Sequence, residues 1–111
     1  MHPITNKANQ LIAYLHNNII LSKEEEVMGV ILGNCIFSKG KTIGKIIKNK
    51  LHLADGKIIG IVGKEELTNT PNDALLHSKA WTILMNIKDH SCSWIEESSE
   101  WDKKNFYQYF N

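Results

Sequence analysis

Residues 51–62, LHLADGKIIGIV, carry the pattern that predicts the fold. Leu51-His52-Leu53 alternates apolar and polar side chains, and the apolar run Ile58-Ile59-Gly60-Ile61-Val62 predicts a returning strand. Asp55-Gly56 lies between them and supplies the two positive-φ positions that a type I′ turn requires. The stretch is therefore expected to form a β-hairpin.

Three similar units precede this one. Each contains a small residue, Ala13, Gly29, Gly44 or Gly60, and these four residues are spaced 16, 15 and 16 apart. Three further apolar columns follow the same spacing: Ile12, Met28, Ile43 and Ile59 one position before the small residue, Leu15, Ile31, Ile46 and Val62 two after it, and Ile4, Ile20, Cys35 and Leu51 nine before it. A unit this short cannot bury its apolar face alone, so four are expected to assemble.

The turns and the small residues refine this prediction. Lys39-Gly40 holds the turn position of the third unit and Asn9 suits that of the first, whereas Glu24-Glu25 fits poorly, which predicts a looser second turn. Apolar columns three residues apart cannot share one face of a regular strand. We therefore expect either a bulge beside each small residue or a sheet covered on both faces.

The units resemble bacterial proteins described as four-fold β-flowers. The resemblance covers residues 4–64 and rests on four hydrophobic-Gly/Ala-x-hydrophobic steps: Ile12-Ala13-Tyr14-Leu15, Met28-Gly29-Val30-Ile31, Ile43-Gly44-Lys45-Ile46 and Ile59-Gly60-Ile61-Val62. It implies a pseudo-four-fold arrangement of hairpins in a bacterial protein, and no activity. The acidic second turn and the long tail depart from that pattern. A PRC-barrel-like or other small closed barrel is the structural alternative.

The tail, residues 65–111, is predicted to be mainly helical. Thr70-Pro71-Asn72-Asp73 has the composition of a helix start and predicts a helix near residues 71–89. Ser93-Trp94-Ile95-Glu96 has capping-box spacing and predicts a second short helix. The first helix is expected to be heavily buried through Leu76, Ala80, Leu84 and Ile87, with Trp81, Ile83 and Met85 widening its apolar stripe. The fold class is therefore α+β, a single domain over residues 1–111 with the tail packed on the hairpins.

Composition limits the compartment and the partners. No apolar run approaches the roughly 20 residues of a membrane span, and the N-terminus shows no secretory signal, so we expect a cytoplasmic protein without a membrane partner. Cys35 and Cys92 are accordingly expected to be reduced. Residues 1–64 hold nine Lys and four acids (+5), and residues 65–111 hold four Lys and eight acids (−4). We interpret the lysines as edge protection, which makes a nucleic-acid partner the weaker alternative.

No residue pattern assigns catalysis, a cofactor or a metal. Gly40-Lys41-Thr42 lacks the glycine that a phosphate loop needs five residues earlier, where Cys35 stands. His77, His90 and Cys92 supply too few neighbouring metal ligands. Cys35 and His52 could act as thiol and base, but the sequence supplies no third group to orient the base. The acidic run 24–26 is predicted to be a solvated turn.

Aromatic residues near the end of the chain are the candidate interaction residues. Trp101, Phe106, Tyr107 and Phe110 are expected either to pack on the hairpins or to anchor a protein partner or a second copy of the chain. The sequence thus favours a non-enzymatic interaction or assembly module. A small enzyme with a site between the repeats and the tail is the alternative, and a weak lysine-based nucleic-acid binder is the third.

Overall fold

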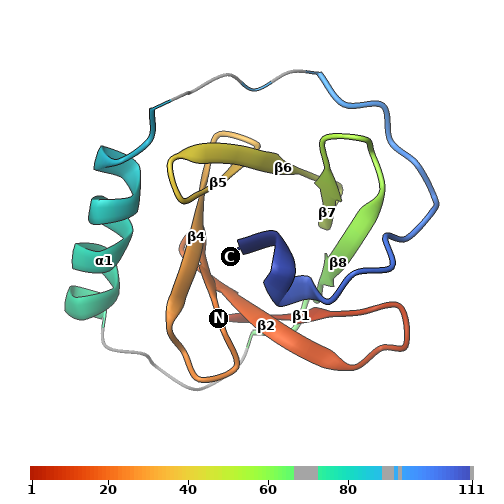
Figure 1. Cartoon of the computed structure of the whole chain (residues 1–111). Helices are drawn as coiled ribbons and strands as arrows, with labels where there is room; N and C mark the ends of the chain where they lie inside the picture. Colours follow the sequence, from red (N-terminus) through yellow and green to blue (C-terminus); the bar gives the residue numbers. More distant parts are fainter. Residues whose placement is uncertain (67–72, 89–91, 93, 111) are drawn as a thin grey trace.

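The computed structural model describes residues 1–66, 73–88, 92 and 94–110. Within residues 1–66, eight antiparallel strands form a closed barrel in which each strand pairs with the next and β8 returns to β1 (Figure 1). The strands are β1 (His2–Thr5), β2 (Leu11–His16), β3 (Ile19–Leu21), β4 (Val27–Leu32), β5 (Cys35–Ser38), β6 (Lys41–Ile47), β7 (Lys50–Leu53) and β8 (Ile58–Val62). With a helix packed outside the barrel, the fold class is α+β, as predicted.

Four tip loops join β1 to β2, β3 to β4, β5 to β6 and β7 to β8. In the first, second and fourth, a backbone hydrogen bond (Asn6 to Gln10, Ser22 to Glu26, Leu53 to Lys57) encloses three residues, of which the last has a positive φ: Asn9 (62°), Glu25 (63°) and Gly56 (90°). The third is a two-residue turn, with Lys39 at 51° and Gly40 at 81°. The type I′ prediction is thus wrong for Asp55-Gly56, where Gly56 alone has a positive φ. The shorter third loop accounts for the spacing of 15 rather than 16.

The acidic second loop is closed by hydrogen bonds, contrary to the looser turn that was predicted. The amide of Ser22 donates to the carbonyl of Glu26 at 2.8 Å, and that of Glu25 donates to Ser22 at 2.9 Å. The Ser22 Oγ also accepts hydrogen bonds from the amides of Glu24 and Glu26. A side-chain oxygen that caps its own turn in this way stabilises a loop whose other residues are unfavourable.

Every hairpin has a shift in register next to its small residue. Ile4 lies opposite Ala13, Ile20 opposite Gly29, Ile36 opposite Gly44 and Leu51 opposite Gly60, and the register shifts immediately after each pair. The shift leaves Ile12, Met28, Ile43 and Ile59 without a paired residue, as in a bulge. In the third hairpin Ile36 takes the position that the sequence assigned to Cys35, because the tip loop is one residue shorter.

The bulges turn the apolar columns toward one core. Ile4, Ile20, Ile36 and Leu51 are completely buried there, and they pack with residues from both other apolar columns. Backbone bonds also link successive hairpins: the amides of Ile31, Ile46 and Val62 donate to the carbonyls of Asn18, Asn34 and Asn49 at 2.7–2.8 Å. An Asn therefore accepts this bond in each of the three turns between successive hairpins.

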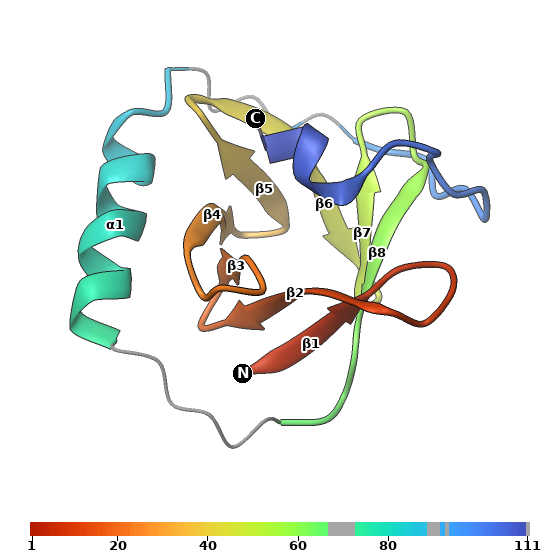
Figure 2. The same ribbon diagram turned by 60° about the horizontal axis from the view of Figure 1, so that its bottom comes forward.

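The end of the chain completes this core. The 3-10 helix η1 (Phe106–Phe110) lies over one end of the barrel, and Phe106 and Phe110 are each only 5% exposed (Figures 1 and 2). A Cβ atom added at Gly29 would lie 3.0 Å from the Phe110 ring, and one added at Gly60 would lie 3.5 Å from the Phe106 ring. The small residues therefore leave the space that these aromatic rings fill.

Helix α1 (Asp73–Met85) packs outside the barrel on β4 and β5. Leu76, Ala80 and Ile87 are buried in a second apolar cluster with Phe37 and Val30, and Leu84 packs at its edge. The prediction of a heavily buried helix is wrong for Trp81 and Met85, which are 62% and 70% exposed. α1 also ends earlier than predicted, and residues 70–72 of its expected start lie outside the described residues.

The described residues that follow position 93 run around the outside of the barrel (Figure 1). We call residues 94–102 the strap. They contain no helix, so the second helix predicted to begin there is wrong for Trp94-Ile95-Glu96, while Ser93 lies outside the described residues. The strap is tied to β8 because the amide of Ile58 donates to Glu100 and the amide of Asp102 donates to Ile58. Ser98 of the strap also donates its amide hydrogen to the carbonyl of Gly56, at 3.2 Å.

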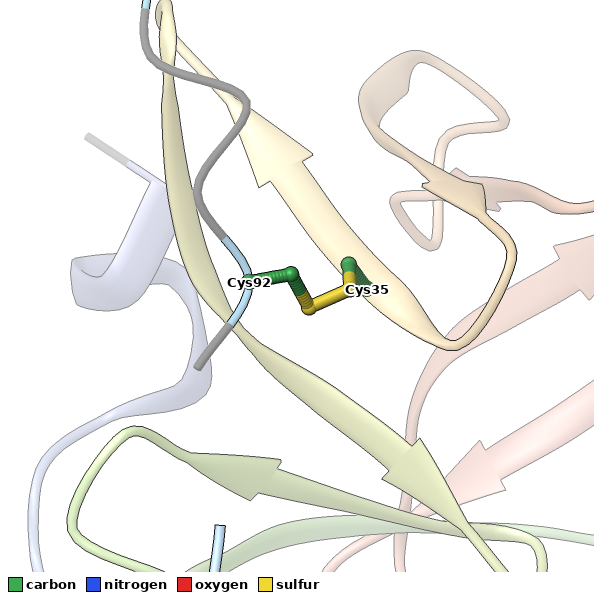
Figure 3. Close-up of a disulfide and its surroundings, with 2 residues drawn as sticks. All are labelled: Cys35 and Cys92. Carbon is green, nitrogen blue, oxygen red and sulfur yellow. A yellow bond between two sulfur atoms is a disulfide. The ribbon is translucent and has the colours of Figure 1, made fainter. Parts of the chain in front are cut away.

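Cys35 and Cys92 form a disulfide, which corrects the expectation of two free thiols (Figure 3). Their Cα atoms are 6.2 Å apart, within the range that disulfides span. The bond joins strand β5 to the segment between α1 and the strap. The two cysteines meet because the tail folds back onto the barrel, and the local sequence pattern did not predict that route. In the described residues, no helix is long and apolar enough to cross a membrane.

Candidate binding cleft

A cleft of about 830 Å³ lies where the tail returns to the barrel. Its walls are the first tip loop, Lys23 of the second tip loop, and the tail from Trp101 to Tyr107. Its apolar lining includes Ile12, Ile59 and Phe106, of which Ile59 and Phe106 are buried core residues. The volume is within the range of about 300–1,000 Å³ that is typical of ligand sites.

Tyr107 fixes the tail against two hairpins at this cleft. Its hydroxyl donates a hydrogen bond to the carbonyl of Ile12 at 2.7 Å and accepts one from the amide of Lys23 at 3.4 Å. The Phe106 and Tyr107 rings meet edge to face, with centroids 6.1 Å apart. The cleft therefore has a wall held by hydrogen bonds and by aromatic packing.

Lysines surround the cleft. Lys7 and Lys23 are the first of the three residues enclosed in the first and second tip loops, and Lys104 belongs to the tail. All three are exposed, and no ion pair with another described residue occupies their ammonium groups. These lysines were not predicted to be site residues. A usable signal was present, because Lys39 begins the third tip loop in the same way.

Asp102 is the acid that lines the cleft among the described residues, and its charge is already engaged. The Tyr109 hydroxyl and the Lys104 amide both donate to Asp102 Oδ1. These bonds, that of Tyr109 first, lower the pKa of Asp102. Burial, followed by the bond to Asp102, raises the pKa of Tyr109. The pair thus stays as carboxylate and neutral phenol over a wide pH range and fixes the tail just before η1.

This pair predicts how stability depends on pH. A lowered carboxyl pKa stabilises the fold above the unfolded value of 3.8 and loses that contribution as pH falls through the folded pKa. The raised pKa of Tyr109 stabilises the fold below the unfolded value of 10.0, and this stabilisation is lost at more alkaline pH. Tyr109→Phe should therefore lower the melting temperature at neutral pH, with a deficit that shrinks below pH 3.8. An equal deficit at every pH measured by calorimetry would contradict a role for the Asp102 charge.

A second cleft, of about 690 Å³, lies between the third tip loop and the C-terminal part of α1. The four candidate interaction residues line these two clefts. The first cleft is lined by Trp101, Phe106 and Tyr107, and the second by Tyr107 and Phe110. Phe106 and Phe110 lie in the core, the first of the two roles expected for them, whereas Trp101 and Tyr107 are partly exposed. Their role as interaction residues remains a prediction.

The other candidate residues do not converge. Cys35 is held in the disulfide, and strand β6 lies between its strand and that of His52, so these two residues form no catalytic dyad. His52 is buried, with Nδ1 2.8 Å from the Gly56 carbonyl. His77 is exposed on α1, and His90 lies outside the described residues. No group of three potential metal ligands occurs in the described part of the chain.

Two other motifs and one ion pair of exposed residues lie apart from the cleft. A strand, β6, follows Gly40, as expected for a turn rather than a phosphate loop. Residues 24–26 are exposed in the second tip loop, as predicted. Glu97 of the strap faces Lys48 at 3.7 Å, with both side chains open to solvent.

Comparison with known proteins gives no relative from which a site could be transferred. No family model matches the chain, and no curated protein or solved structure matches it either.

Proposed function

We propose that this chain is a non-enzymatic protein-interaction module that binds a segment of a protein partner in the cleft beside the strap. We further propose that its barrel is a pseudo-four-fold assembly of the β-flower type. The recurring pairs of an apolar residue with Ala13, Gly29, Gly44 or Gly60, each followed by the same register shift, support this second proposal.

One observation carries the functional proposal. Trp101 and Tyr107, both partly exposed, line one cleft above the buried ring of Phe106. Aromatic side chains supported from below and open on one side are typical binding anchors, because they add contact area at a low entropic cost. The hydrogen bonds of Tyr107 to two hairpins hold this surface in place before a ligand arrives.

Selection from a random peptide display library on the immobilised full chain tests the proposal. Peptides selected on the unmodified protein should bind Trp101→Ala at least about tenfold more weakly, as expected for a hot-spot aromatic residue. Trp94→Ala is the matched control, because Trp94 is 79% exposed and borders neither cleft. Circular dichroism should show both variants folded.

Two results would overturn the proposal. One is a selection that yields no binding peptides. The other is a set of peptides that bind Trp101→Ala as well as they bind the Trp94→Ala control, since the cleft would then not be the binding surface.

A further inference from the structure

The charge of the cleft indicates what kind of segment it takes. Lys7, Lys23 and Lys104 place three positive charges around it, against the one negative charge of Asp102. Asp102 accepts two hydrogen bonds from within the tail, and its charge also acts on Lys104, but within the described residues it forms no ion pair with any of the three lysines. The ammonium groups are therefore available to carboxylates of a ligand.

The bottom of the cleft is apolar, in contrast to its rim. Ile59 is 5% exposed and Phe106 is 5% exposed, and the partly buried Ile12 lies beside them. The partly exposed Trp101 also lines the cleft. A ligand that fits must combine negative charge with an apolar or aromatic group.

We propose that the cleft recognises an acidic peptide segment in which carboxylates flank an apolar or aromatic side chain. This inference rests on the proposed function and adds the chemistry of the partner. The apolar side chain lies against Ile12, Ile59 and Phe106, while the carboxylates meet Lys7, Lys23 and Lys104.

The charges beyond the cleft favour a peptide over a nucleic acid. Glu24, Glu25 and Glu26 follow Lys23 directly in the second tip loop and are all exposed. A nucleic-acid strand carries a phosphate at every nucleotide and would be repelled where it passes this loop. A peptide can confine its acids to the cleft. Lysine also lacks the planar fork by which arginine grips phosphate, and this chain contains no arginine.

The test uses the same peptide selection on two charge variants of the full chain. In Lys7→Gln/Lys23→Gln/Lys104→Gln the cleft loses three charges. The control, Lys41→Gln/Lys64→Gln/Lys79→Gln, loses three exposed lysines that border neither cleft. We expect the selected peptides to be enriched in Asp and Glu beside an apolar residue. Their affinity should fall at least about fivefold on the cleft variant, remain unchanged on the control, and weaken as salt is added.

The possible outcomes separate the two proposals. Peptides that require Trp101 but show no excess of acids, or that bind the cleft variant normally, would overturn the acidic-segment inference and leave the proposed function standing. A selection without any binding peptide would overturn both. A single-stranded oligothymidine that binds through the same three lysines, measured by fluorescence anisotropy, would show that the ligand is a nucleic acid instead.

Discussion

Replacing Cys92 with serine is expected to lower the free energy of unfolding by about 4 kcal/mol. The disulfide to Cys35 closes a loop with a sequence separation of 57 residues, and cross-linking such a loop restricts the unfolded chain strongly. The bond also ties the tail to β5 at Cys92, between α1 and the strap. Urea denaturation followed by circular dichroism measures the change in the free energy of unfolding.

Cys35→Ser should cause a loss similar to that of Cys92→Ser, and the double variant should lose little more, because one bond is removed in each case. The unmodified protein treated with reductant should approach the stability of the single variants. Equal stability of the oxidised protein and the Cys92→Ser variant would contradict a disulfide that constrains the fold.

The disulfide also concerns the compartment of the protein. Disulfides persist in oxidising compartments and are rare in the cytosol. Both cysteines are partly exposed, so a reducing environment has access to the bond. The cytoplasmic location therefore remains a prediction, and the Cys35–Cys92 bond counts against it.

The second large effect is expected for Phe106→Ala, which should cost about 3–5 kcal/mol in the free energy of unfolding. The Phe106 ring is buried in the barrel core and contacts the Phe110 ring, with centroids 5.1 Å apart. Removing it leaves a cavity beside Gly60, which has no side chain of its own to fill the space. Thermal and urea denaturation measure the loss.

Trp94→Ala provides the control for the Phe106 variant. The Trp94 side chain is mostly exposed, so its removal should change the free energy of unfolding by no more than about 0.5 kcal/mol. Phe106→Ala with the stability of this control would show that the ring does not belong to the core.

The hairpins could be predicted from the sequence because their signals are local. The spacing of Ala13, Gly29, Gly44 and Gly60 gave the period of the hairpins, and a bulge was one of two ways to place apolar residues three apart on one core. The assignment of Cys35 to the apolar column failed because a two-residue turn replaced a three-residue loop. The spacing of 15 between Gly29 and Gly44 records the missing residue, but it does not show that the residue is missing from the tip loop, after Cys35, rather than before it.

The tail was harder to predict because its contacts join residues far apart in the chain. Trp81 and Met85 belong to an apolar pattern typical of a buried helix, but α1 packs on one side of the barrel and leaves them exposed. Nothing near Cys92 in sequence indicates that it meets Cys35. Periodicity describes which residues share a face, and the partner of that face depends on the path of the chain.

The candidate cleft was predicted only in part. The aromatic residues of the tail were identified, because their density near the end of the chain is unusual. Lys7 and Lys23 were not, because they are 97 and 81 residues from Lys104 in sequence, and only the return of the tail to the first two tip loops brings the three together. Lysines at the same position of successive loops are a signal that sequence analysis of such hairpins can use.

The central claim is that the last residues of the chain cover one end of the barrel and build the cleft. Nuclear Overhauser effects between the Phe110 ring protons and the Gly29 Hα protons test it most directly, because a Cβ atom at Gly29 would lie 3.0 Å from that ring. We expect strong cross-peaks for this pair in the full chain. Absence of these cross-peaks, with Phe110 resonances at the shifts of an unstructured peptide, would contradict the claim.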